Sequence, residues 1–231
     1  MRNFTVLICL SIYSTLFSQN NFFRNDSDPL FDGRFGVTIG ATNYITDASY
    51  LFSKSSTGFT VGVLGTAELS ERFELFFEIN YNKHFVKFVG RENQLAEPRD
   101  IKFNLQNISI PILLNYSYLI KDDYKLGVNI GPSFDLLYNY NLVNESEFDY
   151  VLDPLYVEPY DLEFDTRSDG KISFNMFVAF GLNFQYNERF MTSLRYYYGI
   201  TDPYRNSPVF SPVIDITGRD SYFAWTFTYF I

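Results

Sequence analysis

The sequence predicts an all-β fold, namely an eight-stranded antiparallel transmembrane β-barrel connected as an up-and-down meander. The first observation is the stretch 222–231, YFAWTFTYFI, in which large apolar side chains alternate with mostly small or hydroxylic ones. A strand has a side-chain period of two, so this stretch has one large apolar face. The second observation is that the alternation recurs along the chain. The third is that short and long connections alternate between the strands.

Composition favours strands over helices as the elements that cross the membrane. Aromatic residues make up 20% of the chain, with 26 Phe and 19 Tyr, which suits side chains that meet lipid and its interface. Past the N-terminus there is no run of about 18 apolar residues, so a transmembrane helix is not expected. The formal net charge is −9, and Lys and Arg are scattered; a nucleic-acid partner is therefore not expected.

The strands are expected at about 34–44, 57–69, 72–87, 102–118, 124–139, 171–186, 189–201 and 222–231. In the third, the odd positions from Phe73 to Tyr81 are apolar and are expected to face outward. In the sixth, the residues opposite the apolar face are small or polar except Phe177. In the fourth, the apolar positions change from odd to even near Gln106, which predicts a β-bulge at Gln106–Asn107.

The connections have two lengths. Three are tight, at 70–71, 119–123 and 187–188, and four are long, at 45–56, 88–101, 140–170 and 202–218. This alternation is typical of bacterial outer-membrane barrels, which have short periplasmic turns and long outer loops. An even number of strands then places both ends of the barrel domain on the periplasmic side.

The size of the side chains predicts which face points outward. A soluble lipocalin-like cup would place its apolar face inside. The interior of an eight-stranded barrel is only just wide enough for side chains to fill, and the large apolar residues of every strand do not fit there. The apolar face is therefore expected to face lipid, where a closed barrel leaves no unpaired strand edge.

The chain divides into three expected parts. Residues 1–18 resemble a cleaved signal peptide, because Arg2 precedes an apolar run from Phe4 to Phe17. Residues 19–33 are expected to be a periplasmic lead-in, and residues 34–231 the barrel domain. The single cysteine, Cys9, lies within the signal, so no disulfide or cysteine metal site is expected. Export combined with a barrel predicts the outer membrane of a Gram-negative cell.

Several segments resemble a known family. They are ISIPILLNYSY at 108–118, LGVNIGPSFDLL at 126–137, YYYGITD at 196–202 and the aromatic final strand. Together they are similar to the small outer-membrane β-barrel proteins of Bacteroidetes, named porin-family or PorT-like proteins. The resemblance implies a barrel over about 34–231 and, through PorT, a role in type IX protein secretion. Ile231 stands where the family usually has Phe.

Six charged residues are expected to face the barrel interior: Glu68, Glu74, Glu78, Lys125, Asp135 and Arg195. Glu78 and Arg195 are expected at similar height. Buried charges need partners, so we expect an ion-pair network that fills the lumen. The alternative is a polar path through a narrow diffusion pore.

The connection 140–170 is rich in acidic and aromatic residues, which makes it a candidate partner-docking loop. The residues concerned are Glu145, Glu147, Asp149, Tyr150, Asp153, Tyr156, Glu158, Tyr160, Asp161 and Glu163. A solvated loop is one alternative. A calcium site is another, because acidic oxygens suit Ca²⁺, but Arg167 and Met176 stand where calcium ligands would be needed.

His84 is the single histidine. A lipid-modifying barrel enzyme would need a histidine with a nearby serine and carboxylate, and the third strand has no serine beside His84. We expect a surface or rim histidine, no catalysis, no cofactor and no metal. The sequence thus favours a non-enzymatic outer-membrane protein with a filled lumen, whose outer loops or periplasmic turns contact partners. A type IX secretion component, a narrow pore and a lipid-modifying enzyme are the alternatives.

Overall fold

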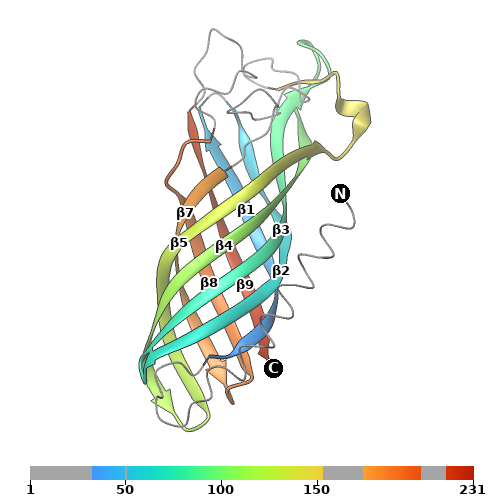
Figure 1. Cartoon of the computed structure of the whole chain (residues 1–231). Coiled ribbons are helices and arrows are strands. Elements are labelled where there is room, and N and C mark those ends of the chain that lie inside the picture. The colour runs from blue at the N-terminus through green and yellow to red at the C-terminus, as the bar shows by residue number, and fades with distance from the viewer. Residues whose placement is uncertain (1–32, 50, 153–173, 204–216) are drawn as a thin grey trace, which may run out of the picture.

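The computed structural model describes residues 33–49, 51–152, 174–203 and 217–231, which form one tilted barrel of antiparallel strands (Figure 1). The strands are β1 (Phe35–Ala48), β2 (Ser53–Ser70), β3 (Phe73–Arg91), β4 (Arg99–Lys121), β5 (Tyr124–Leu142), β6 (Val151–Leu152), β7 (Phe174–Tyr186), β8 (Phe190–Gly199) and β9 (Gly218–Phe230). A short 3-10 helix, η2, spans Glu145–Glu147. No helix in the described residues is long and apolar enough to cross a membrane.

Eight strands form a closed ring, in which each strand pairs with its neighbours in the meander. The first and last strands close the ring, since β1 pairs with β9 from Gly36 opposite Phe230 to Ala48 opposite Gly218. The two-residue β6 lies outside the ring and extends β3 by pairing Leu152 with Gly90. The predicted eight-stranded antiparallel meander is confirmed. Closure pairs the backbone groups of every strand, which a bilayer requires.

The three predicted tight turns lie together at one end of the barrel, here called the turn end, which is the lower end in Figure 1. The β7–β8 turn has three residues, 187–189, because Tyr186 pairs with Phe190, and φ is positive at Asn187 (48°) and Glu188 (53°). The opposite end, here called the loop end, carries the longer connections. There the predicted loops 45–56 and 88–101 were too long, because β1 runs to Ala48, β2 begins at Ser53, β3 runs to Arg91 and β4 begins at Arg99.

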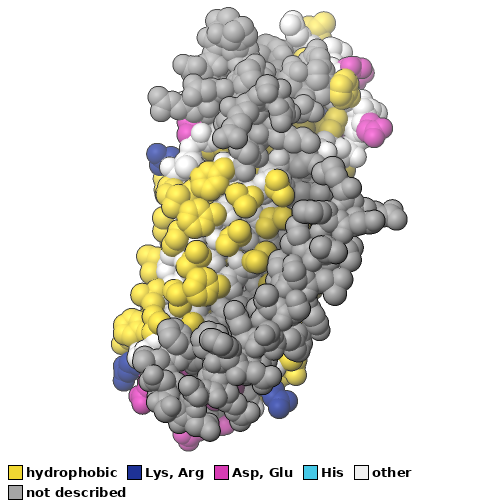
Figure 2. Space-filling view, in the orientation of Figure 1, with side chains coloured by type: hydrophobic (Ala, Val, Ile, Leu, Met, Phe, Trp, Pro, Cys, Tyr) yellow, Lys and Arg dark blue, Asp and Glu magenta, His cyan; other side chains and the backbone are white. Residues whose placement is uncertain are grey.

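The sidedness of the wall agrees with the prediction. Phe77, Phe180 and Phe227 are exposed on the outer face, while Glu78 and Asn183 are buried inside. Figure 2 shows hydrophobic side chains gathered over the middle of the wall, with charged side chains toward both ends. Such an apolar belt is stable in lipid, whereas in water a patch of this extent would cause aggregation.

The sidedness reverses near the loop end, and this explains the missed strand ends. Beyond Tyr81, β3 directs Lys83 and Lys87 outward and buries Val86 and Phe88 inside. Polar outside and apolar inside is the pattern of a strand whose outer face meets water. These segments therefore extend the wall beyond the apolar belt, and their polar outward residues made them look like loops.

The predicted bulge is present at the expected height but in the neighbouring strand. β4 keeps its alternation without interruption, and Phe103 and Leu105 point inward. The β4–β5 register shifts between Gln106 and Ile108, and the extra residue lies in β5 at Leu137, whose φ is 58°. The apolar residues of β4 change from one face to the other because the strand leaves the apolar belt, and not because its inward–outward alternation is interrupted.

Candidate functional site in the barrel lumen

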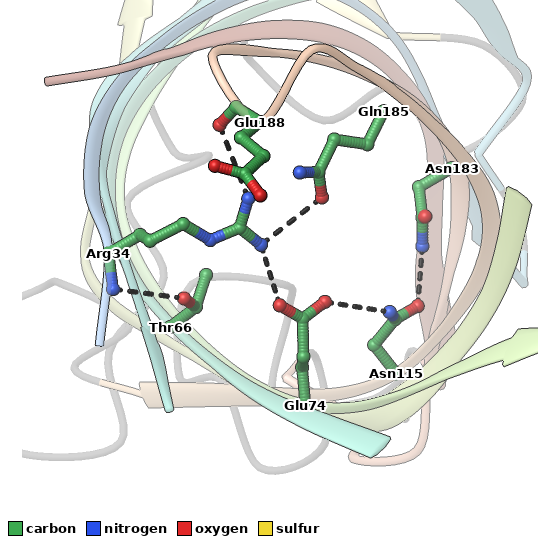
Figure 3. Close-up of polar contacts among 7 residues, drawn as sticks. All are labelled: Arg34, Thr66, Glu74, Asn115, Asn183, Gln185 and Glu188. Carbon is green, nitrogen blue, oxygen red and sulfur yellow. Dashed lines mark hydrogen bonds and ion pairs between the residues drawn. The ribbon is translucent and has the colours of Figure 1, made fainter. Parts of the chain in front are cut away.

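Near the turn end, polar side chains from four strands meet inside the barrel (Figure 3). The Arg34 guanidinium, just before β1, forms an ion pair with Glu74 of β3 at 2.6 Å and donates to Gln185 of β7 at 3.1 Å. Asn115 donates to the second oxygen of Glu74 at 3.4 Å and accepts a hydrogen bond from Asn183 at 2.5 Å. These contacts connect β1, β3, β4 and β7 across the interior.

Arg34 is a partner that the sequence did not single out. Its position was visible in the pattern, because Arg34 is in phase with the inward residues Gly36 and Thr38. Its guanidinium also lies 4.5 Å from the centre of the Phe230 ring, which helps to hold it inside. A basic residue in inward phase just before the first strand was the available signal.

Toward the middle of the barrel, Arg195 of β8 and Glu78 of β3 form the second charged cluster. Their Nη1 and Oε1 atoms are 2.6 Å apart, and both side chains are 2% exposed. Asn80 donates to the other Glu78 oxygen at 3.0 Å. The pair spans the diameter, because three strands separate β3 from β8 in either direction around the ring. A buried carboxylate and guanidinium need such a partner.

The third cluster contains two buried carboxylates, Asp135 of β5 and Asp220 of β9. Asp135 accepts hydrogen bonds from Asn107 at 2.6 Å and from Ser133 at 3.1 Å. Asp220 accepts from Thr46 at 2.9 Å and, more weakly, from Asn175 at 3.3 Å. Asp220 was missed because the last strand was expected to begin at 222, although it lies in inward phase with the residues that follow.

The two remaining charged candidates, Glu68 and Lys125, lie at the turn end and are half-buried. In the register, Glu68 lies opposite Glu74 and Lys125 opposite Gln185. Neither forms an ion pair with a described residue. The six predicted charges thus fall into the Glu74, Glu78 and Asp135 clusters and two peripheral positions, instead of one continuous set.

An aromatic layer lies above the central ion pair, and Tyr222 is at its centre. Tyr222 stacks on Tyr197 with ring centroids 4.2 Å apart and meets Phe177 edge-on at 5.4 Å. Tyr44 lies on another side, 5.6 Å from Tyr222 and 4.4 Å from His84. All of these side chains are at most 3% exposed.

His84 belongs to this layer, so the expectation of a surface or rim histidine was wrong. Its Nδ1 is 2.9 Å from the Thr42 hydroxyl, and its Nε2 has no hydrogen-bond partner among the described residues. The ring is buried because β3 continues well past it toward the loop end. In the described part of the chain, no group of three or more His, Cys, Asp or Glu residues could hold a metal ion.

Toward the loop end the interior becomes apolar. The buried residues there are Ala48, Leu51, Val86, Phe88, Ile101, Phe103, Leu105 and Leu152. Phe88 and Phe103 meet edge-on at 5.4 Å, and Leu152 of β6 is fully buried. The described interior therefore passes from polar clusters through an aromatic layer to an apolar core.

The first part of the acidic connection is attached to the loop end of the wall. Arg99 of β4 donates to Glu147 at 3.4 Å, and its guanidinium lies 4.2 Å from the Tyr150 ring centre. Glu145 lies in η2 and Asp149 follows it. The other candidate docking residues lie outside the described residues: Asp153, Tyr156, Glu158, Tyr160, Asp161 and Glu163.

The closed ring and the outward apolar belt define the chain as a membrane-spanning β-barrel. A family model described as an outer membrane protein beta-barrel domain matches residues 17–205, and the chain belongs to this family. No curated protein matches the chain.

Solved outer-membrane proteins resemble the structure. The chain is 13% identical to OprG from Pseudomonas aeruginosa, with a TM-score of 0.50 over 87% of this chain and 97% of OprG. It is 11% identical to Ail, the attachment invasion locus protein of Yersinia pestis, with a TM-score of 0.40 over 86% of this chain and 99% of Ail. Neisserial surface protein A shares 13% identity, with a TM-score of 0.39 over 84% of this chain and 96% of its own. Because only 13% of the residues are identical, the similarity to OprG shows that the two proteins share the barrel fold and shows nothing about function.

Proposed function

We propose that this chain is a non-enzymatic outer-membrane protein whose lumen is closed by its own side chains and whose exposed ends contact partners. The observation that carries this proposal is the Arg195–Glu78 ion pair, which crosses the diameter at 2.6 Å with both side chains 2% exposed. A pore would need a continuous column of water at this level. The aromatic layer and the apolar core toward the loop end support closure at two further levels.

Closure is tested by recording conductance of the purified protein in planar bilayers. We expect no steady channels from protein whose folded state is shown by heat-modifiable migration on a gel. A general porin inserted under the same conditions is the control for the bilayer. Steady channels of substantial size would contradict closure and favour the narrow diffusion pore.

An enzymatic role has little support in the site. The His84 ring contacts Thr42, Tyr44 and Tyr222, and none of these residues supplies the carboxylate that would orient a catalytic histidine. Incubation of the folded protein with phospholipid and with lipid A is expected to release no acyl chain. Release that is lost in His84→Ala would contradict the non-enzymatic role.

The proposal includes the division of the chain. Residues 1–18 are a cleaved signal peptide, residues 19–33 a periplasmic lead-in, and residues 34–231 the barrel domain, with the turn end in the periplasm. Residues 1–32 lie outside the described residues, so support comes from the sequence. The mass of the protein isolated from the outer-membrane fraction is expected to equal that of a chain that begins at Gln19. A mass that includes Met1 would contradict cleavage.

A second candidate, a PorT-like component of the type IX secretion system of Bacteroidetes, is favoured by the Ile-Pro and Gly-Pro segments. In the structure Pro111 lies in β4 opposite Ser133, the residue that follows Pro132 in β5. Deletion of the gene is expected to leave type IX substrates inside the cell if this role holds. Normal secretion in the deletion strain would contradict this role and favour a barrel that acts outside the secretion system.

The acidic connection is the proposed docking element at the loop end. Its described part carries the exposed Phe148 beside Tyr150, and aromatic residues are enriched at protein interfaces. Glu145, Glu147 and Asp149 would favour a partner with a basic surface. Cross-linking from a photoreactive residue at Asp149 in cells is expected to capture a protein. The same residue placed at Asp122 in the turn between β4 and β5 is the control.

A further inference from the structure

Three lysines from three strands lie side by side on the outer face near the loop end. Lys87 of β3 lies opposite Lys54 of β2 on one side and opposite Lys102 of β4 on the other. Lys83 lies four residues further toward the turn end on the same face of β3. We call Lys54, Lys83, Lys87 and Lys102 the lysine patch. Like charges directly opposite each other destabilise a sheet, so this arrangement needs a compensating anion.

The protein supplies only part of that compensation. Asp100 contacts Lys54 directly, and its second oxygen is 3.8 Å from the Lys87 ammonium. One carboxylate against four ammonium groups leaves an excess of positive charge, on a chain whose formal net charge is −9. Lys54 and Lys87 keep 56% and 37% of their side chains exposed, so an external anion can reach them.

The lysine patch borders the apolar belt. Lys83 lies opposite Phe59 in the register, and Phe59 and Tyr81 are exposed on the outer face with ring centroids 6.5 Å apart. Phe85 lies among the ammonium groups, with Lys102 Nζ 4.4 Å and Lys83 Nζ 5.8 Å from its ring centre. The charge thus lies where the outer face changes from apolar to polar, which is the level of lipid headgroups.

We propose that the lysine patch binds the phosphate groups of a phosphorylated lipid in the outer leaflet of the outer membrane. Such a lipid places anionic headgroups against the ammonium groups and acyl chains against Phe59 and Tyr81, so one molecule meets both surfaces. A soluble polyanion would use the lysines alone and leave their border with the apolar belt without a role. The inference rests on the proposed orientation, with the loop end outside the cell, but not on closure of the lumen.

The test compares binding of diphosphoryl lipid A to the full-length protein with binding of dephosphorylated lipid A, by native mass spectrometry from detergent micelles. The test variant is Lys54→Gln/Lys87→Gln/Lys102→Gln. The control is Arg72→Gln/Lys121→Gln/Arg189→Gln, which removes the same charge at the turn end. Each basic residue near an anionic lipid surface contributes about five-fold in affinity, so we expect the test variant to lose roughly 100-fold and the control less than about five-fold.

Asp100→Asn keeps the inference testable if the triple variant does not fold. It removes the carboxylate that competes with the lipid phosphate, so binding of diphosphoryl lipid A is expected to tighten by about five-fold. Equal binding of the phosphorylated and dephosphorylated lipids by the wild-type protein would overturn the proposal. So would unchanged binding by a folded triple variant, or displacement of the lipid by an equimolar sulfated polysaccharide. None of these outcomes depends on whether the lumen conducts.

Discussion

Arg195 and Glu78 lie on strands that face each other across the ring, and their ion pair at 2.6 Å crosses the full diameter of the barrel. Each of the two strands alone would present an uncompensated charge to a narrow, water-poor interior. Closure of the ring in this register brings the two side chains to one height, where each compensates the charge of the other.

We expect Glu78→Gln to destabilise the folded barrel by about 3–5 kcal/mol, because it leaves the Arg195 charge buried and unpaired. The double variant Glu78→Gln/Arg195→Met removes both charges and is expected to recover most of this loss. Urea unfolding in lipid vesicles measures the change. Glu68→Gln, at a half-buried position with no ion pair to a described residue, is the control and is expected to change stability by less than about 1 kcal/mol. Equal effects of Glu78→Gln and Glu68→Gln would show that the pair contributes nothing specific.

The close approach of β4 and β5 at Gly131 predicts a second sensitive position. A Cβ on Gly131 would lie 2.0 Å from the Ile112 carbonyl oxygen and 2.9 Å from the Leu113 Cα, and backbone atoms cannot move aside as a side chain can. We expect Gly131→Ala to destabilise the barrel by about 3 kcal/mol, at the upper end of the cost of overpacking. At Gly65 the nearest atom to an added Cβ is 3.9 Å away, so Gly65→Ala is the matched control. A folded fraction in Gly131→Ala equal to that of Gly65→Ala would contradict the observed spacing.

The reversal of sidedness gives a test of where the lipid ends. Leu182 is exposed in the apolar belt, and Leu182→Arg is expected to cost about 2–4 kcal/mol because a charge there meets hydrocarbon. Val89 faces outward on the part of β3 that extends beyond Lys87, and Val89→Arg is expected to cost less than about 1 kcal/mol. Unfolding titrations in vesicles distinguish the two. Equal costs at both positions would mean that the apolar belt continues to the end of β3.

Deletion within the acidic connection tests whether it is a docking element or part of the barrel. Leu152 is fully buried and pairs with Gly90, so a deletion that begins after Leu152 keeps the apolar core intact. Removal of residues 154–165 is expected to leave insertion and heat-modifiable migration unchanged while abolishing partner cross-linking at Asp149. Loss of insertion in this variant would show that the connection is structural. Leu152→Ser, in the full-length chain, is the positive control for damage to the core.

Much of the fold followed from local pattern. The period-two alternation of β3 and β7 predicted which residues face lipid, and the inward position of Phe177 was predicted although it is large. Strand ends were harder to predict, since Lys54 and Arg91 were assigned to loops, whereas the structure shows that β2 and β3 continue past the apolar belt. The bulge in β5 at Leu137 was assigned to β4 for the same reason.

The sequence by itself determined the eight strands of the ring, their connection and the face of the residues within the apolar belt, because these depend on neighbours along one strand. Tertiary structure decided which residues meet: Arg195 with Glu78, Arg34 with Glu74, Asp220 near Asp135, and Lys54 beside Lys87 and Lys102. The physical reason is that pattern assigns a side chain to a face, whereas its height in the barrel and its neighbour across the interior depend on the register between strands and on closure of the ring. Arg195 and Glu78 are 117 residues apart in the chain, and only the closed ring brings them into contact.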